Sequence, residues 1–417
     1  WIEKLQAGEL KRVNWLPWSG IKREWRDFKT RKYQISFVGR ITAHRPARQW
    51  LVNYLKEKFN AFIAQEIPFA RMLEIYEQTK LAPNEAIAGE VNFRTFEAAS
   101  CGCLVLNQDL GDEISSLFVP GKETLIFHHV LELQELLEYY SKHQSQAENI
   151  ARAGWTRIQR EHLPEHRAAT LLNYAQNISP GTYTSRQNLK NIVFSIFLLW
   201  QNQASSFSKK EIIDLFFKLP IDPEVLSALV ELHADKKNKV ESFLIPILEQ
   251  KQYDFHLLLN VTCSFAGLKH NNFPLARQFW YRYFLSKGQE PRPVSTPLQL
   301  CLFWAKELAR KGEIFRIGLR FDPGNMLPQC ALECLVYADY LESQNKEVLK
   351  TILALIRDQK GLEPLLLQIQ SHLSLLEPEN YRLGLELALT NFRAFRLKQG
   401  MEELILAFET AKKMNKA

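Results

Sequence analysis

The chain has 417 residues, of which 46% are hydrophobic and 24% are charged, and its formal net charge is +7. This is an ordinary globular composition, and the length indicates two or three domains. Lys and Arg are scattered along the chain, which excludes the concentrated basic footprint of a nucleic-acid-binding protein. We therefore expect no nucleic-acid partner.

The cysteines bear on the cellular compartment. Cys101 and Cys103 flank a glycine, and Cys330 and Cys334 are four residues apart. Neither spacing is a zinc pattern with a second half nearby. We expect buried reduced thiols, no metal ion and a cytoplasmic location.

The chain carries no obvious targeting or membrane segment. Its longest apolar run, residues 192–200, is too short to span a bilayer. We recognise no signal-peptide pattern in the given sequence and expect none. Because the chain starts at Trp1 rather than Met, we expect it to be a fragment or a processed product.

Strands alternate with helices over roughly the first 185 residues. Apolar runs predict strands and apolar residues at helical spacing predict helices. The predicted strands are 33–38, 62–64, 80–83 (as a strand or a loop), 103–106 and 124–127. The predicted helices begin near Pro46 and then cover 69–78, 95–100, 130–140, 147–158 and 162–174. This alternation predicts βαβ units and a parallel sheet. Turn-forming residues at 179–183 are expected to end this domain.

From Asn188 onward the strand signals largely stop. Amphipathic helices of about 12–18 residues follow one another, with predicted breaks at 219–220, 246, 288–297, 322–324 and 377–378. The last pair is predicted at 381–397 and 401–413, joined by Gln399 and Gly400. Parts of this region resemble tetratricopeptide helices, but no strict 34-residue period is present. We predict a degenerate helical repeat or α-solenoid.

The stretch from Val91 to Leu106 is the most informative in the chain. Arg94 and Glu97 are three residues apart, so they share a face of the predicted helix. Gly102 ends that helix where a left-handed cap is usual, and an apolar strand follows. Open α/β sheets bind ligands at the carboxyl ends of their strands, where a carboxylate can accept from vicinal hydroxyls and an arginine can clamp a diphosphate.

The segment 96–102 and the strand after it resemble the nucleotide-binding element of GT-B glycosyltransferases: an acidic residue, small residues, a glycine and then a β-strand. Segments 15–17, 35–39, 75–80 and 118–123 are similar, in order, to other parts of these enzymes. They correspond to the interdomain segment, the first strand of the C-terminal domain, the segment before the donor-site loop and the loop that follows. The resemblance covers roughly residues 13–175 and is nearest to the group-1-like family that includes spore-maturation-type proteins.

The resemblance implies a fold class and a domain plan. The fold class is an α/β Rossmann-like half of a GT-B enzyme followed by an all-α helical-repeat domain. Residues 1–33 are expected to be a linker and the remnant of a missing N-terminal domain, 34–185 the nucleotide-sugar-binding domain, and 186–417 the helical repeats.

The resemblance also implies an activity. We expect a glycosyltransferase that moves a sugar from a nucleotide-sugar donor to an acceptor, either a glycan or a protein recruited by the helical region. GT-B enzymes generally need no bound metal or other cofactor. The alternative is a non-catalytic nucleotide-sugar fold that acts as a scaffold or protein-binding module.

Glu97 is the leading candidate for donor binding, through the ribose hydroxyls; the alternative is a helix carboxylate placed for the dipole. The resemblance implies that Arg94 binds phosphate, whereas the alternative is a surface salt bridge. Asn92 is expected to hold the loop before them.

Further donor-site candidates lie near the first strand and before Glu97. Gly39 and Arg45 follow the strand at a turn and helix start, where backbone N–H groups form anion sites; Lys80 is a similar phosphate candidate. Many retaining GT-B enzymes have a second glutamate, but the matching position here is Gly89 and Glu90 is one place off. The stereochemical outcome and the general base therefore stay open.

Two other residue clusters have ordinary explanations. His44, His128 and His129 lie on predicted loops, and the last two lack a third metal ligand. The aromatic run at 273–284 is expected to pack between repeat helices, with an exposed peptide-binding groove as the alternative.

Overall fold

The computed structural model describes residues 14–42, 45–86, 90–177, 185–235, 237–316, 321–359 and 362–416. The predicted turn at 179–183, His44 and Gly89 lie outside these ranges. The chain divides into two compact units. The sheet unit comprises Trp1–Ser179 and Asp358–Ala417, and the helical unit comprises Pro180–Arg357.

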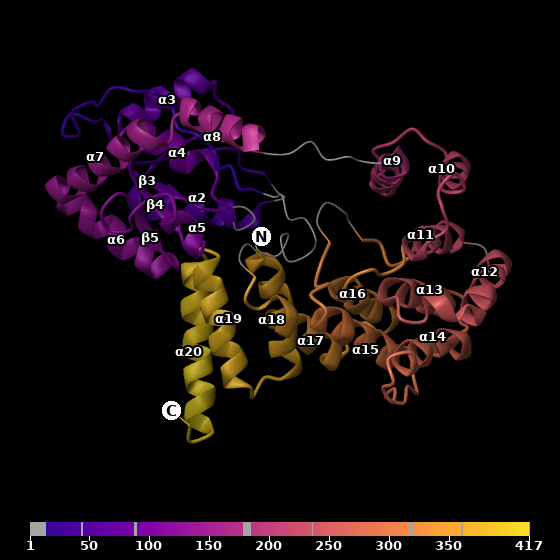
Figure 1. Ribbon diagram of the computed structural model, residues 1–417. Helices are drawn as coiled ribbons and strands as arrows, with labels where there is room; N and C mark the ends of the chain where they lie inside the picture. Colours follow the sequence, from indigo (N-terminus) through magenta and orange to yellow (C-terminus); the bar gives the residue numbers. More distant parts are fainter. Residues whose placement is uncertain are drawn as a thin grey trace. The chain divides into compact units, whose positions relative to one another are not determined.

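The described residues of the sheet unit form five parallel strands in the order β2-β1-β3-β4-β5, shown in indigo and violet in Figure 1. The strands are β1 (Tyr33–Val38), β2 (Phe62–Ala64), β3 (Thr79–Asn84), β4 (Leu104–Gln108) and β5 (Leu125–Phe127). The predicted fold class, a Rossmann-like parallel sheet followed by helices, is confirmed.

The strand order fixes where a ligand crevice can form. The chain passes from β1 to β2 on one side and then returns to β3 on the other side of β1. The connections on the two sides of this point therefore diverge, which leaves a topological switch point at the carboxyl ends of β1 and β3.

The sheet is buried on both faces, as all-parallel sheets usually are. Side chains alternate along each strand. Leu81 and Leu104 belong to one apolar cluster, together with residues of α2 and α6. Ala82 and Val105 belong to a second cluster, together with residues of α3 and α4.

The helices of this part of the sheet unit are α2 (Pro46–Phe59), α3 (Phe69–Glu77), α4 (Phe93–Ser100), α5 (Asp112–Ser115), α6 (Val130–Lys142), α7 (Gln144–Glu161) and α8 (Pro164–Asn177). Helix α4 begins two residues before its predicted start, because Asn92 caps it. Gly102 follows α4 with a φ of +76°, as the predicted left-handed cap requires.

The described part of the helical unit consists of helices α9 (Ser185–Gln201), α10 (Lys209–Phe216), α11 (Pro223–His233), α12 (Lys237–Glu249), a 3₁₀ turn η1 (Lys251–Tyr253), α13 (Leu257–Lys269), α14 (Phe273–Leu285), α15 (Pro297–Arg310), α16 (Ala331–Leu341) and α17 (Lys346–Ile356). Pro246 does not break the chain as predicted, because it lies inside α12. The aromatic run packs mainly in the core, where Trp280 and Tyr283 contact Trp304.

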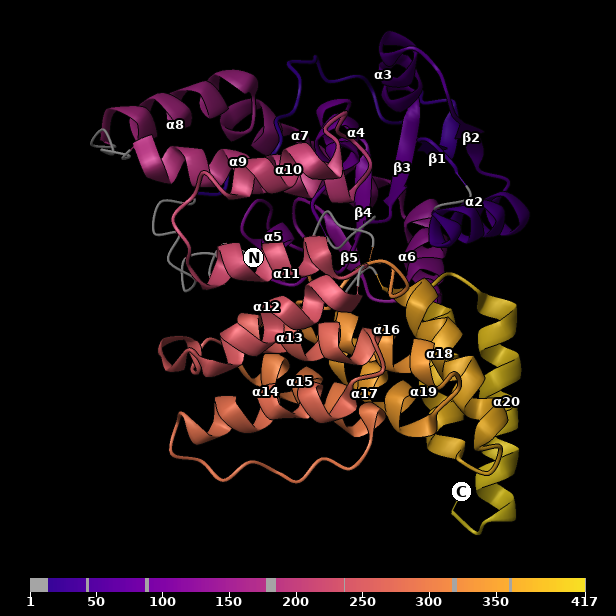
Figure 2. The same cartoon turned by 90° about the vertical axis from the view of Figure 1, so that its right-hand side faces the viewer.

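The last three helices, α18 (Glu363–Leu376), α19 (Tyr381–Arg393) and α20 (Leu397–Lys413), group with the sheet unit rather than with α9–α17. Figure 2 shows them in yellow and gold. Phe395 packs edge-on against Phe127 at the end of β5. Local sequence patterns do not indicate this long-range contact, which explains why 186–417 was expected to be one region. The predicted domain boundaries stay a prediction.

The predicted break at Gln399 and Gly400 is wrong. Both residues lie inside α20, and the chain turns earlier, at Phe395, whose φ is +63°. Gly400 permits close packing, because an added Cβ would lie 2.4 Å from the Phe392 ring. The glycine is therefore a contact point between α19 and α20.

Candidate functional site

Buried polar side chains line the carboxyl edge of the sheet. Asn84 ends β3, and Asn107 lies beside it near the end of β4. Asn84 Nδ2 donates to Asn107 Oδ1 at 2.8 Å and to Thr95 Oγ1 at 2.9 Å, and Asn107 Nδ2 donates to Thr124 Oγ1 at 2.9 Å. This hydrogen-bonded row ties the strand ends to α4, since buried polar groups need such partners.

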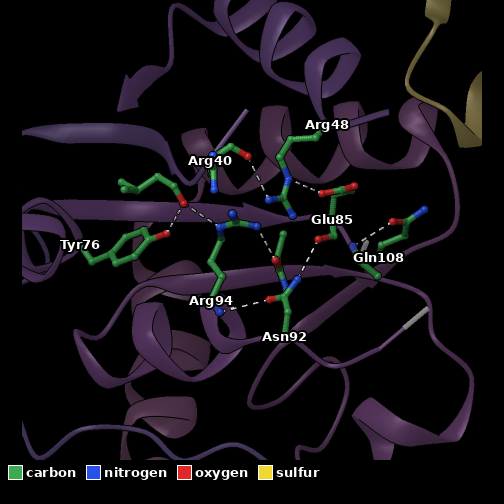
Figure 3. Close-up of polar contacts among 10 residues, drawn as sticks. Arg40, Arg48, Tyr76, Glu85, Asn92, Arg94 and Gln108 are labelled. Carbon is green, nitrogen blue, oxygen red and sulfur yellow. Dashed lines mark hydrogen bonds and ion pairs between the residues drawn. The ribbon is translucent and has the colours of Figure 1, made fainter. Parts of the chain in front are cut away.

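Arg94 inserts its guanidinium between the ends of β1 and β3 (Figure 3). Its Nε donates to Val38 O at 3.0 Å and its Nη1 donates to Asn84 Oδ1 at 2.8 Å. Tyr76 Oη also donates to Val38 O, at 3.2 Å. The arginine therefore lies at the topological switch point of the sheet.

Gly39 makes this insertion possible. A Cβ built at Gly39 would lie 2.2 Å from Arg94 Nη2. Any larger residue would have to displace the guanidinium. Gly39 is consequently required by the close approach of Arg94.

Arg94 is a buried cation whose charge is only indirectly compensated. It is 7% exposed and its guanidinium lies 4.1 Å from the centroid of the Phe37 ring. Burial lowers the pKa of Arg94, while the nearby Tyr76 and Glu85 side chains oppose that effect. Among the described residues, no carboxylate forms a direct ion pair with Arg94. Its positive charge is thus available to act on an anion at this edge.

Glu85 and Arg48 form a buried ion pair beside Arg94. Arg48 Nε donates to Glu85 Oε2 at 2.8 Å, and both side chains are about 5% exposed or less. Arg48 also donates to Arg40 O after β1. Burial raises the pKa of Glu85, against the lowering effect of the arginines around it. The pair joins α2 to the end of β3.

Hydrogen bonds link the residues after β3 to those at the start of α4 and the end of β4 (Figure 3). Asn92 Nδ2 donates to Glu85 O at 2.9 Å, and Asn92 Oδ1 accepts from Arg94 N at 3.1 Å. Ala86 N donates to Gln108 Oε1 at 3.2 Å. Asn92 is thus the N-cap of α4, and its place in the donor site stays a prediction.

Glu97 differs from the other charged groups of the site. It is half-buried, and within the part of the chain that the structure describes its carboxylate accepts no hydrogen bond and forms no ion pair. Burial raises the pKa of Glu97, and the charge of Arg94 opposes this rise. The fold leaves these carboxylate oxygens unused, which is what a ligand contact requires.

The structure brings most of the predicted donor-site residues to one edge. Gly39 touches Arg94, and Arg45 is the half-exposed N-cap of α2, close enough to Glu85 to affect the pKa of that carboxyl. Arg94 itself is buried and structurally engaged, so it is neither a surface salt bridge nor a freely exposed clamp. Glu90 is half-buried two residues before the α4 cap.

Lys80 does not join this site. It is the second residue of β3, which starts at Thr79, so it lies at the amino end of the strand. The sequence pattern left open whether residues 80–83 form a strand or a loop. The structure places the carboxyl end of β3 at Asn84. The expectation that Lys80 belongs to the donor site is therefore corrected.

Sequence reasoning missed the residues that organise the edge: Arg48, Asn84, Glu85, Asn107 and Gln108. One signal was present in the sequence. A polar residue directly follows each of the two apolar strands 81–83 and 104–106. Since the carboxyl ends of parallel strands meet at one edge, such residues become neighbours.

The histidines and cysteines have structural surroundings. His128 is exposed and contacts Glu132 at 2.8 Å, while His129 Nδ1 accepts from Glu132 N at the start of α6. The six cysteines are free and buried. No group of three or more potential metal ligands occurs among the residues that the structure describes.

Comparison with known families adds an independent finding. Residues 23–173 match the model of a glycosyl transferase-like family. This span contains all five strands and the whole carboxyl-edge network. The match supports a glycosyltransferase domain in this part of the chain. Neither a curated protein nor a solved structure matches the chain. Within the described residues, no helix is long and apolar enough to cross a membrane.

Proposed function

We propose that the sheet unit transfers a glycosyl group from a nucleotide-sugar donor bound at the carboxyl ends of β1 and β3. One observation carries this proposal. A buried, indirectly compensated cation, Arg94, lies at the switch point beside the unused carboxylate of Glu97. A nucleoside diphosphate needs both kinds of group, since it carries anionic phosphates and vicinal ribose hydroxyls.

The proposed donor contacts divide between two helices. The Glu97 carboxylate on α4 accepts hydrogen bonds from the ribose hydroxyls. Arg45 and the first N–H groups of α2 face the diphosphate, because a helix N-terminus and a cation both favour an anion. Arg94 contributes its positive field, and its fixed hydrogen bonds hold that charge in place.

This arrangement favours departure of the nucleoside diphosphate. As the bond between the anomeric carbon and the diphosphate oxygen breaks, negative charge grows on that oxygen. Positive charge that is already oriented stabilises the charge without further reorganisation. The acceptor oxygen attacks the anomeric carbon as the diphosphate leaves, and its proton passes to a solvent water molecule. We also propose that the acceptor is a protein and that the helices after the sheet recruit it.

The test is calorimetric titration of the full chain with uridine, guanosine and adenosine diphosphates and with matching nucleotide sugars. We expect Glu97→Ala to weaken nucleotide binding by about 1–3 kcal/mol, the range for a hydrogen bond to a charged group. Arg45→Ala should weaken binding of the diphosphate but not of the free nucleoside. Glu74→Ala is the matched control, because this exposed carboxylate on α3 pairs only with Arg71 among the described residues.

A second measurement separates an enzyme from a scaffold. Release of nucleoside diphosphate from the preferred nucleotide sugar is followed by chromatography. Turnover that Glu97→Ala lowers and Glu74→Ala leaves unchanged supports glycosyl transfer. Binding without any turnover favours the non-catalytic alternative, and equal nucleotide affinity of the wild type and Glu97→Ala removes Glu97 from the site.

A further inference from the structure

Two aromatic rings stack on each other at the start of α4. The centroids of the Trp18 and Phe93 rings lie 3.9 Å apart, and the angle between the ring planes is 30°. Trp18 is 48% exposed and Phe93 is 50% exposed. The contact between them therefore leaves flat aromatic surface open to solvent. We call these two residues the aromatic stack.

Other groups hold the chain segment that carries Trp18. The Arg167 guanidinium of α8 donates to Pro17 O at 2.9 Å and to Trp18 O at 3.1 Å. Gly20 N donates to His162 O at 2.7 Å. Because these hydrogen bonds to the main chain anchor the segment, the exposed part of the indole ring is not required as an anchor. The ring is instead held in one place in advance of any ligand.

The aromatic stack lies beside the proposed donor site. Phe93 is the first residue of α4, and Glu97 is four residues later. Residues at this spacing share a face of the helix, with their Cβ atoms about 5–6 Å apart. Arg94, the residue after Phe93, turns its guanidinium inward to the ends of β1 and β3. A ligand held by Glu97 therefore has positive charge on its sheet side and aromatic surface along the helix.

The connectivity of a nucleotide selects the occupant of this surface. The base and the diphosphate are attached at opposite ends of the ribose. With the ribose hydroxyls on Glu97 and the diphosphate toward Arg94 and Arg45, the base is the group that remains to lie along α4 toward Phe93. The sugar to be transferred lies beyond the diphosphate, so it is farther from the aromatic stack.

We propose that the nucleobase of the donor stacks on the rings of Trp18 and Phe93. This inference rests on the proposed function, because it places the base relative to a ribose held by Glu97. Every nucleobase has a flat π face, so stacking stabilises any of them and discriminates weakly between them. The aromatic stack thus makes a base necessary for tight donor binding, with little selection of which base it is.

The test is calorimetric titration of the full chain with uridine, guanosine and adenosine diphosphates. We expect Trp18→Ala and Phe93→Ala each to weaken binding by about fivefold or more, the scale of base stacking on an aromatic side chain. Trp18→Phe keeps a ring and should stay within about threefold of the wild type. Trp15→Ala is the matched control, because Trp15 is an exposed tryptophan of the same segment outside the stack. Its affinity should equal that of the wild type.

A spectroscopic readout separates stacking from an indirect structural effect. The ultraviolet absorbance of a base falls when the base stacks on another ring. We expect this fall for nucleotide bound to the wild type and to saturated Glu97→Ala, but not to Trp18→Ala. Thermal unfolding checks that each variant is folded.

The outcomes distinguish this inference from the proposed function. Wild-type affinity in both Trp18→Ala and Phe93→Ala, together with weakened binding in Glu97→Ala, overturns the aromatic stack and leaves the donor site in place. An unchanged base absorbance on binding to the wild type also overturns stacking. If none of the nucleotides binds the wild type, the proposed function itself fails, and this inference fails with it.

Discussion

Both units bury charged side chains, but they use them differently. At the sheet edge, Arg94 donates to a backbone carbonyl and an amide, and the nearby Glu97 is left without a partner among the described residues. In the helical unit, Glu231 is 8% exposed and both of its oxygens accept from side-chain amides. The first cluster leaves binding capacity unused, whereas the second uses its capacity to join helices.

The Glu231 cluster is built from several elements. Gln201 of α9 donates to Glu231 Oε1 at 2.9 Å, and Gln329 donates to Oε2 at 2.8 Å. Arg316 Nη1 donates to Gln329 Oε1, and the same arginine forms two hydrogen bonds with Glu333 of α16. A polar network satisfied in this way specifies packing.

The difference shows how to distinguish a candidate site from a structural joint. Perturbed pKa values occur in both places, so they do not discriminate. The two clusters differ in their position in the fold and in whether their polar groups all have hydrogen-bond partners. The sheet-edge cluster lies where open sheets bind ligands, and one of its carboxylates has no described partner. The following substitutions test this distinction.

The largest effect is expected from Arg94→Met. The substitution removes two charge-assisted hydrogen bonds and leaves Asn84 Oδ1 without its arginine donor. We expect the free energy of unfolding to fall by about 3–4 kcal/mol, measured by urea denaturation. Arg71→Met is the control, since that arginine forms an exposed pair with Glu74 and should change stability by less than about 0.5 kcal/mol. A small effect at Arg94 would mean that the network does not hold the strand ends.

Glu231→Gln should produce the next largest effect, and that effect should depend on pH. Burial raises the pKa of Glu231 to about 7, with Arg316 lowering it and Glu333 raising it. The native state therefore binds the proton more tightly than the unfolded chain. The free energy of unfolding contributed by Glu231 falls as pH rises from about 4.5 to about 7, by about 3 kcal/mol in total.

Comparison of the two proteins across pH isolates this contribution. Glu231→Gln removes the titrating group, and Gln201 can turn its amide to meet the new donor. We expect the variant to gain stability relative to the wild type as pH rises through this window, with a constant difference above it. Lys269 also interacts electrostatically with Glu231. The variant Lys269→Met therefore tests how much the lysine charge contributes to the pH dependence of stability. Parallel pH profiles of the wild type and Glu231→Gln would show that Glu231 titrates normally.

Gly39→Ala should cost about 1–3 kcal/mol, the usual range for overpacking in a closely packed site. The predicted cause is the contact with Arg94 Nη2 rather than the backbone conformation. A double-mutant cycle with Arg94→Met tests this cause, because the cost of the alanine should largely disappear once the guanidinium is gone. Gly324→Ala is the control, since its added Cβ would meet only Asp322 Oδ1, at 3.3 Å. Strictly additive costs would assign the effect to another contact.

The sequence predicted the strands, their parallel arrangement and the α4 region, because apolar periodicity and the turn at Gly102 are local signals. Helix and turn positions together with the family resemblance indicated donor-site candidates, and their role stays a prediction: Gly39, Arg45, Asn92, Arg94 and Glu97. The sequence did not indicate that Arg94 would be buried, since that depends on the absence of a side chain at Gly39, far away in the chain. Nor did the sequence predict the contact between Phe395 and Phe127, because a contact between residues far apart in the chain leaves no periodic pattern. Lys80 was chosen because it ends the segment that resembles the part before the donor-site loop, but it lies at the amino end of β3, away from the carboxyl edge.

The smallest change in stability is expected from Glu97→Gln, and its sign is informative. Burial raises the pKa of Glu97 and the charge of Arg94 opposes only part of this rise, so ionisation of this carboxyl costs folding free energy at neutral pH. Removing the charge should leave stability at neutral pH unchanged or slightly higher, as expected where a residue is kept for function rather than for packing. Thermal unfolding at pH 5 and pH 7.5 measures this, and the difference between variant and wild type should be larger at the higher pH. A clear loss of stability would show that the Glu97 carboxylate makes contacts that hold the fold, and the distinction between the two clusters would fail.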